Sequence, residues 1–252
     1  MPDLLVLLTL PLIFAFICIY FRVNFLISIV ALFVVPSLWL ALKLRKRSTK
    51  ILIFSLVAGI LGTILVDPFA THNHVWMVKS IYLINILGGI PIEQFLWSVS
   101  FIFLVTAFYE FFCLKKNSGS LFDKKLPILI VVFAILFTVF VSTNYLSVLV
   151  AYIKYIYFLG GMMIFGIPII IVFYKIPAER SSIFYTAFYF IVLNSVYEFV
   201  AVSLGLWSFP GAANYIFSFY FYGRLLPLEE ILFFSILGSS GVLSYYLLFD
   251  ND

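Results

Sequence analysis

Uninterrupted apolar runs of about 20 residues recur along the whole chain, and each is long enough to cross a lipid bilayer as a helix. Only helices and closed barrels satisfy their backbone polar groups in lipid. Helices are favoured because the runs are continuous and not alternating. The composition agrees, since 65% of the residues are hydrophobic and 10% are charged, whereas about 25% are charged in a soluble domain. The sequence therefore predicts an all-α, polytopic membrane helix bundle.

We expect eight spans in one integral membrane domain, with seven spans as the main alternative. The first run has no basic segment before it and is interpreted as a retained helix, not as a signal peptide. In the sixth span, Pro168 is expected to kink the helix or to end it early. The predicted spans are 3–21, 24–42, 50–66, 91–113, 126–143, 147–174, 182–204 and 225–248.

Most lysines and arginines lie in the loops after the second, fourth and sixth predicted spans. The positive-inside rule then places both termini in the cytoplasm of a multi-pass protein of the cell membrane. The net charge of +4 is attributed to this orientation and not to nucleic-acid binding. The basic residues of the three loops are Lys43, Arg45, Lys46, Arg47, Lys50, Lys115, Lys116, Lys124, Lys125, Lys175 and Arg180.

One acidic pattern occurs twice. Asp67 precedes Trp76 by nine residues, and Glu198 precedes Trp207 by nine residues. After each tryptophan come a loop and a helix start that combines a proline with acids, IPIEQ in the first copy and LPLEE in the second. Four predicted spans lie in each half, so the halves share one orientation and form a parallel repeat. The repeats are expected over residues 1–115 and 126–250.

Five acids fall at the ends of predicted spans, in the non-cytoplasmic half of the membrane: Asp67, Glu93, Glu198, Glu229 and Glu230. Acids inside a membrane are costly, so each is a candidate catalytic residue. Two adjacent carboxyl groups in an apolar setting cannot both ionise cheaply. One of the Glu229/Glu230 pair should therefore keep its proton and can serve as a general acid.

Two of these acids also have a structural interpretation. Pro91 and Pro227 suit the first position of a helix. Glu93 and Glu229 would then lie in the first turn, where a carboxylate caps the free N–H groups. A structural role is also favoured for Glu110, near the other end of the fourth span.

Aromatic residues are abundant, with 31 Phe, 16 Tyr and 4 Trp. Spacing of four residues places Trp97 on the face of Glu93, Phe233 on that of Glu229 and Phe234 on that of Glu230. Ring faces stabilise a nearby positive charge, although such rings are also ordinary in apolar packing. Trp76 and Trp207 are candidates for substrate contact, but their favoured interpretation is anchoring at the membrane interface.

Other chemistries lack their residues. The chain contains no G-x-G for a dinucleotide, no H-E-x-x-H and no Asp-rich motif for magnesium diphosphate. His72 and His74 are interpreted as part of a polar loop. Neither a metal nor a dinucleotide cofactor is expected, and assistance by reduced flavin stays open.

The stretch from Pro227 to Phe234, preceded by Gly205, Trp207 and Phe209, resembles the membrane-integral lycopene cyclase domain. That family occurs as two small subunits or as one fused chain. The stretch from Ile90 to Trp97 is similar to its other half-motif, with Gln94 in place of a second acid. The resemblance covers about residues 60–250.

This resemblance implies a lycopene β-cyclase, an isomerase without net redox change. An acid protonates the terminal double bond of linear lycopene, the chain folds onto the carbocation, and a base removes a proton to leave the β-ionone ring of γ- or β-carotene. The Glu229/Glu230 pair would be the donor and Glu93 or Glu198 its partner or base. Phe233, Phe234 and Trp97 would shield the cation, and Asp67, Gln94, Trp76 and Trp207 complete the candidate site.

Two alternatives remain. The chain could act by acid on another isoprenoid end group, as a hydratase or an ε-type cyclase. It could also be a proton-coupled carrier, although a carrier would place broken helices and polar groups of both halves around the midplane. The partners expected are the bilayer and a hydrophobic polyene, and the sequence defines no oligomeric state.

Overall fold

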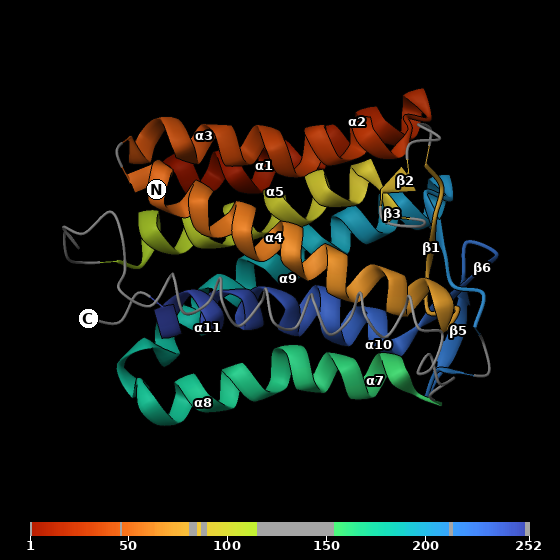
Figure 1. The fold of residues 1–252 in the computed structure, drawn as a ribbon. Helices are drawn as coiled ribbons and strands as arrows, with labels where there is room; N and C mark the ends of the chain where they lie inside the picture. Colours follow the sequence, from red (N-terminus) through yellow and green to blue (C-terminus); the bar gives the residue numbers. More distant parts are fainter. Residues whose placement is uncertain are drawn as a thin grey trace.

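Long helices run side by side between two ends of the molecule (Figure 1). The computed structural model describes residues 2–45, 47–80, 85–86, 90–114, 154–211 and 214–249. Among these, seven helices are long and apolar enough to cross a membrane, by length and composition. They match seven predicted spans, whereas span 126–143 and the first residues of span 147–174 lie outside the described residues. The seven helices are Pro2–Phe21, Phe25–Leu44, Arg47–Pro68, Ile92–Phe112, Ile156–Lys175, Pro177–Leu204 and Leu228–Phe249.

The two ends of the bundle differ (Figure 1). We call the end where α1 (Pro2–Phe21) begins and α11 (Gly238–Phe249) ends the terminal end, and the opposite one the loop end. α5 (Ile92–Phe112) finishes at the terminal end, and α7 (Ile156–Gly161) starts at the loop end. The described helices therefore run in the relative directions that the alternation of basic loops predicts.

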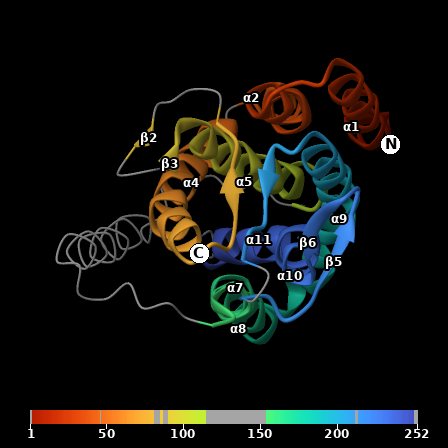
Figure 2. The ribbon, with the colours of Figure 1, turned by 90° about the vertical axis from the view of Figure 1, so that its right-hand side faces the viewer.

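The loop end carries short antiparallel strands (Figure 2). One pair joins the two halves of the chain, because Met77 lies opposite Ser208 and Val78 lies opposite Trp207. The other two pairs are hairpins that lead into helices α5 and α10. The strands are β1 (Met77–Val78), β2 (Asn85–Ile86), β3 (Ile90–Pro91), β4 (Trp207–Ser208), β5 (Ser218–Phe221) and β6 (Arg224–Pro227).

Three of the long helices contain a π-helical segment, a feature that is frequent at functional sites. Two of these segments precede a proline, which lacks a backbone N–H and disturbs a regular helix. The helix does not end early at Pro168, since it continues to Lys175 after a π-helical segment. These three helices are built from α2 (Phe25–Ile29), η1 (Val30–Val34) and α3 (Val35–Leu44); from α7, η2 (Met162–Gly166) and α8 (Ile167–Lys175); and from α10 (Leu228–Glu230), η5 (Ile231–Leu237) and α11.

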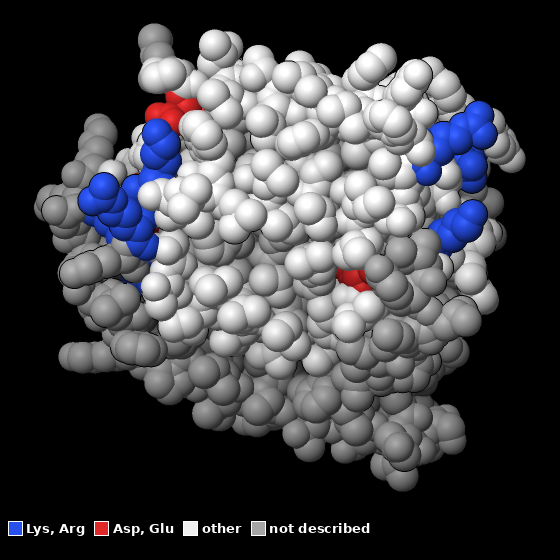
Figure 3. All heavy atoms as spheres, turned by 90° about the horizontal axis from the view of Figure 1, so that it is seen from above, with Lys and Arg blue, Asp and Glu red and all other residues white. Residues whose placement is uncertain are grey.

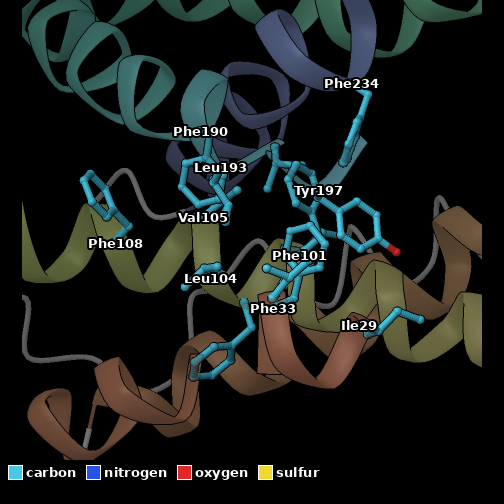
Figure 4. Packing of buried hydrophobic residues seen from close by; sticks show 14 of the residues in the cluster. Ile29, Phe33, Phe101, Leu104, Val105, Phe108, Phe190, Leu193, Tyr197 and Phe234 are labelled. Atoms are coloured by element: carbon cyan, nitrogen blue, oxygen red, sulfur yellow. The ribbon is translucent and has the colours of Figure 1, made fainter. Parts of the chain in front are cut away.

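Small residues and contacts between aromatic rings hold the helices together. A Cβ atom on Gly59 would lie 2.8 Å from Val99, so α4 (Arg47–His72) and α5 approach closely at this glycine. Aromatic side chains then fill the centre of the bundle between α5, α9 (Arg180–Leu204), η1 and η5 (Figure 4). The ring of Phe101 lies 5.9 Å from that of Phe33 and 5.7 Å from that of Phe234.

Charges gather away from the flank of the bundle. Seen from the side of α1 and α3, lysine and arginine side chains lie at the two ends, and the described surface between them is uncharged except for one small acidic patch (Figure 3). A membrane-spanning bundle needs this distribution, because charged side chains are costly in the hydrocarbon core. The flank and the apolar helices together define a helical membrane protein as the class to which this fold belongs.

Glu110 is buried at the terminal end and joins three helices. Its carboxylate accepts a hydrogen bond of 2.5 Å from the Tyr246 hydroxyl and pairs with Arg47 at 3.6 Å. These contacts match the structural role favoured from the sequence.

Candidate functional site

The five candidate acids are all buried at the loop end, with 1% to 7% of their surface exposed. The helices explain this placement, because each acid lies within about two turns of the helix end at that side. Their contacts divide them into two groups. Three acids lie in two inner clusters, and the other two contact the loops that precede their helices. The inner acids are Asp67, Glu198 and Glu230, and the loop-contacting acids are Glu93 and Glu229.

The first inner cluster joins α9, α10 and α7. The Trp207 indole N–H donates to Glu198 Oε1 at 3.1 Å, and the carboxyl group of Glu198 lies next to that of Glu230. The Tyr157 hydroxyl donates to Glu230 Oε2. Two neighbouring carboxyl groups that are both buried cannot both ionise cheaply, so one of them keeps its proton. This cluster therefore holds a proton in a buried place.

The second inner cluster joins α4 and α5 in a corresponding arrangement. Asp67 Oδ1 accepts hydrogen bonds of 3.3 Å from the Trp76 indole and 3.3 Å from the Gln94 amide. Asp67 thus corresponds to Glu198, Trp76 to Trp207, and Gln94 to Glu230. The Gln94 amide donates an N–H and has no acidic proton. The two clusters therefore differ in chemistry, although their contacts correspond. Asp67 Oδ2 is buried and has no hydrogen-bond partner among the described residues.

Glu93 and Glu229 contact the loops that precede them. The Ser80 hydroxyl lies 2.9 Å from Glu93 Oε1, and the Ile216 N–H lies 2.5 Å from Glu229 Oε1. In both copies the donor is 13 residues before the acid. The acids lie in the first helical turn as predicted. Pro91 and Pro227, however, are the capping residues before the helix and not its first residues.

Tyr157 connects the two inner clusters and was not singled out from the sequence. Its hydroxyl contacts Glu230, and its ring lies 5.4 Å from that of Trp76 and 5.9 Å from that of Phe233. No motif marks this tyrosine among the 16 in the chain. The sixth predicted span begins at residue 147, whereas the described helix α7 begins at Ile156, so the predicted bounds did not place Tyr157 at the level of the acids.

The aromatic candidates divide between two sides of the site. Phe234 lies 5.5 Å from Trp97 and 6.1 Å from Trp207, between α5 and α9, whereas Phe233 contacts the rings of α7. The α-helical spacing used to place both phenylalanines does not apply, because residues Ile231–Leu237 form a π-helix. Trp97 does lie on a regular helix. Its indole nitrogen is buried without a hydrogen-bond partner among the described residues.

The two repeated tryptophans have a role that interfacial anchoring did not predict. Each donates its indole N–H to the acid nine residues before it, and Trp207 is buried. Such hydrogen bonds fix the position of a carboxylate. Trp76 and Trp207 therefore position Asp67 and Glu198.

Hydrogen bonds join the loops of the two halves at the loop end. Asn214 donates its amide to the Asn73 carbonyl at 3.1 Å, and the Tyr215 hydroxyl donates to the Val75 carbonyl at 2.7 Å. Burial raises the pKa of Tyr215 above its ordinary value, so the hydroxyl stays protonated and remains a donor. These bonds hold the connection after α4 against the connection after α9.

Comparison with models of protein families, with curated proteins and with solved structures gave no significant match. The function is therefore argued from the geometry of the site.

Proposed function

We propose that this chain is a membrane enzyme that cyclises the ends of a linear carotenoid, as a lycopene β-cyclase does. The observation that carries the proposal is the buried Glu198/Glu230 pair, which holds a proton next to aromatic rings. Protonation of a carbon–carbon double bond needs a general acid, and the cation that forms needs surroundings without water. The pair and the rings supply both requirements at one end of the bundle.

Each part of the site has a step in this reaction. Glu230 lies in contact with both Glu198 and Tyr157, so the Glu198/Glu230 pair is the proposed proton donor. The ring face of Phe234 stabilises the cation through its π electrons. After ring closure a base removes a proton, and the product has the same formula as the substrate. No electron carrier is needed for these steps.

The corresponding contacts support two parallel repeats. The eight predicted spans and the basic loops support a bundle with both termini in the cytoplasm. Nine residues separate acid and tryptophan in both copies, and 13 residues separate the loop donor from the second acid. The pairing of β1 with β4 also relates one copy to the other. A duplicated unit accounts for all of these contacts, with Gln94 in the place of the second acid.

The test uses membranes from cells that express the chain, incubated with lycopene and analysed by pigment chromatography. We expect β-ionone products from the unaltered protein. Unchanged lycopene, in the presence of folded protein, would contradict the proposed function and would leave a proton-coupled carrier as the class to test. A hydroxylated product or an ε-ring would instead identify a related enzyme of isoprenoid end groups.

The matched pair Glu230→Gln and Glu229→Gln tests the donor. Loss of a general acid lowers a rate by about 10²–10⁴-fold, so Glu230→Gln should lower the cyclisation rate by at least about 10²-fold. Glu229→Gln should have a smaller effect, because its carboxylate contacts the Ile216 N–H. Glutamine should fit at position 230, since Gln94 occupies the corresponding position in the other copy. Equal activity of both variants and the unaltered protein would refute this choice of donor.

A further inference from the structure

The two inner clusters have corresponding contacts, but only one of them pairs two acidic groups. In the Glu198/Glu230 cluster both partners are buried carboxyl groups, so one of them keeps its proton. In the Asp67/Gln94 cluster one partner is an amide, which donates N–H to Asp67 Oδ1 and brings no acidic proton of its own. One copy therefore pairs two carboxyl groups, and the other pairs a carboxyl group with an amide.

We infer that Asp67 is the base that ends the reaction, an inference that rests on the proposed function. Two N–H donors converge on its Oδ1, while its Oδ2 is buried with no hydrogen-bond partner among the described residues. Oδ2 is thus an acceptor that no described residue occupies, and it can take a proton. The other candidates for the base are engaged in different ways. Glu93 accepts both contacts from Ser80. Glu198 Oε2 and Glu229 Oε2 are also buried without a hydrogen-bond partner among the described residues, but Glu198 lies next to the Glu230 carboxyl group and Glu229 accepts the Ile216 N–H.

Aromatic side chains separate the proposed base from the acid. Asp67 contacts the Trp76 indole, the Trp76 ring lies 5.4 Å from the Tyr157 ring, and the Tyr157 hydroxyl contacts Glu230. Protonation and deprotonation in a cyclisation take place at different carbons of one end group. A donor and a base on two sides of Trp76 and Tyr157 match this requirement, and the two rings can stabilise the cation between them.

The proton balance of the reaction is complete. The glutamate pair gives its proton to the terminal double bond, which forms a C–H bond and a carbocation. The next double bond attacks this carbon and closes the ring. Asp67 Oδ2 then takes a proton from the carbon beside the new cation, and a double bond forms. The pair regains a proton from water and Asp67 releases one to water before the next turnover, so one solvent proton enters each ring.

The test is the fate of the cation in Asp67→Asn, measured in membranes incubated with lycopene in D₂O. The unaltered protein should give β-rings with one deuterium each. In Asp67→Asn the cation should still form, but the base that normally removes a proton from the carbon beside it is missing. We expect recovered lycopene with deuterium at its terminal double bond, or products captured by water or deprotonated at another carbon. A merely structural role for Asp67 would not produce labelled lycopene.

Two further variants complete the design. Gln94→Glu gives Asp67 a carboxyl partner and so forces a shared proton at this cluster. It should show the same labelled or diverted products while Asp67 itself is kept. Asp3→Asn is the matched control, because Asp3 pairs with Lys43 at the terminal end, and its products should equal those of the unaltered protein.

The outcomes separate the inference from the proposed function. Normal products from both Asp67→Asn and Gln94→Glu would overturn the role of Asp67 and leave the cyclase intact. Unlabelled, unchanged lycopene from folded Asp67→Asn would also overturn it, because Asp67 would then act in the protonation step. Unchanged lycopene from the unaltered protein would refute the cyclase itself.

Discussion

At the scale of single residues, acidic side chains are buried at both ends of the bundle, but their partners differ. At the loop end, the inner carboxyls contact indoles, a tyrosine and each other. At the terminal end, Glu110 contacts a cation, Arg47, and the Tyr246 hydroxyl. A buried carboxylate with such partners stabilises the fold, and the loss of one partner leaves a buried group with incomplete compensation.

The first prediction concerns this pair. Arg47→Met should lower the free energy of unfolding by about 1–3 kcal/mol, because Glu110 stays buried without its cation. Glu110→Gln should cost less, since the amide oxygen can still accept the Tyr246 hydrogen bond. The double variant should recover part of the loss. Unfolding in detergent, followed by circular dichroism, gives these values, and an Arg47→Met variant as stable as the parent would contradict the pairing.

A second residue-scale prediction concerns Tyr157, which positions Glu230. Tyr157→Phe keeps the ring against Trp76 and removes the donor to Glu230. A hydrogen bond to a charged group contributes about 1.5–3 kcal/mol, so we expect kcat to fall by about 10-fold or more with little change in KM. Tyr155→Phe, at an exposed tyrosine two residues away, is the control. A change confined to KM would show that Tyr157 binds substrate and does not position the acid.

At the scale of elements, the site depends on the contact between α7 and η5. A Cβ atom on Gly161 would lie 2.5 Å from the Phe233 ring, whereas nothing lies within 4 Å of one on Gly160. The glycine at position 161 therefore lets the π-helical segment pack against α7, next to Tyr157.

The adjacent glycines give a matched test of this packing. Gly161→Ala should destabilise the protein by about 1–3 kcal/mol, as overpacking does. Gly160→Ala should be neutral or stabilising by about 0.4–1 kcal/mol, because alanine restricts the unfolded chain. Thermal unfolding of the two variants in one detergent decides the prediction. If both variants unfolded at the same temperature, the close contact with Phe233 would be wrong.

At the scale of the whole molecule, we predict that the two ends of the bundle lie on opposite sides of the membrane. Thr49 is exposed at the terminal end and Tyr220 at the loop end. In a chain whose Cys18 and Cys113 are replaced by serine, Thr49→Cys should react with a membrane-impermeant thiol reagent only from the cytoplasm. Tyr220→Cys should react only from the other side. Labelling of both from one side would refute the orientation.

The sequence predicted the described spans because the hydrophobicity of a segment is a local property. The spacing of the repeated motif likewise predicted which acids lie at one end. It did not predict that Glu230, and not Glu229, contacts Glu198, since that depends on the packing of α9 against α10. The opposite directions of Phe233 and Phe234 follow from a π-helical segment that has no proline to signal it. Tyr157 lies in the site because of tertiary packing alone, so no local sequence pattern indicates it.

The bonds between the two connections at the loop end bear on how the protein is made. Asn73 is held by Asn214, 141 residues later in the chain. The ribosome must therefore synthesise most of the polypeptide before Asn73 can bond to Asn214. Until then the nascent chain has Asp67 and Trp76 but lacks the glutamates of the last helices. Biosynthesis should thus yield inserted but inactive intermediates, and activity should arise only when the final segment enters the membrane.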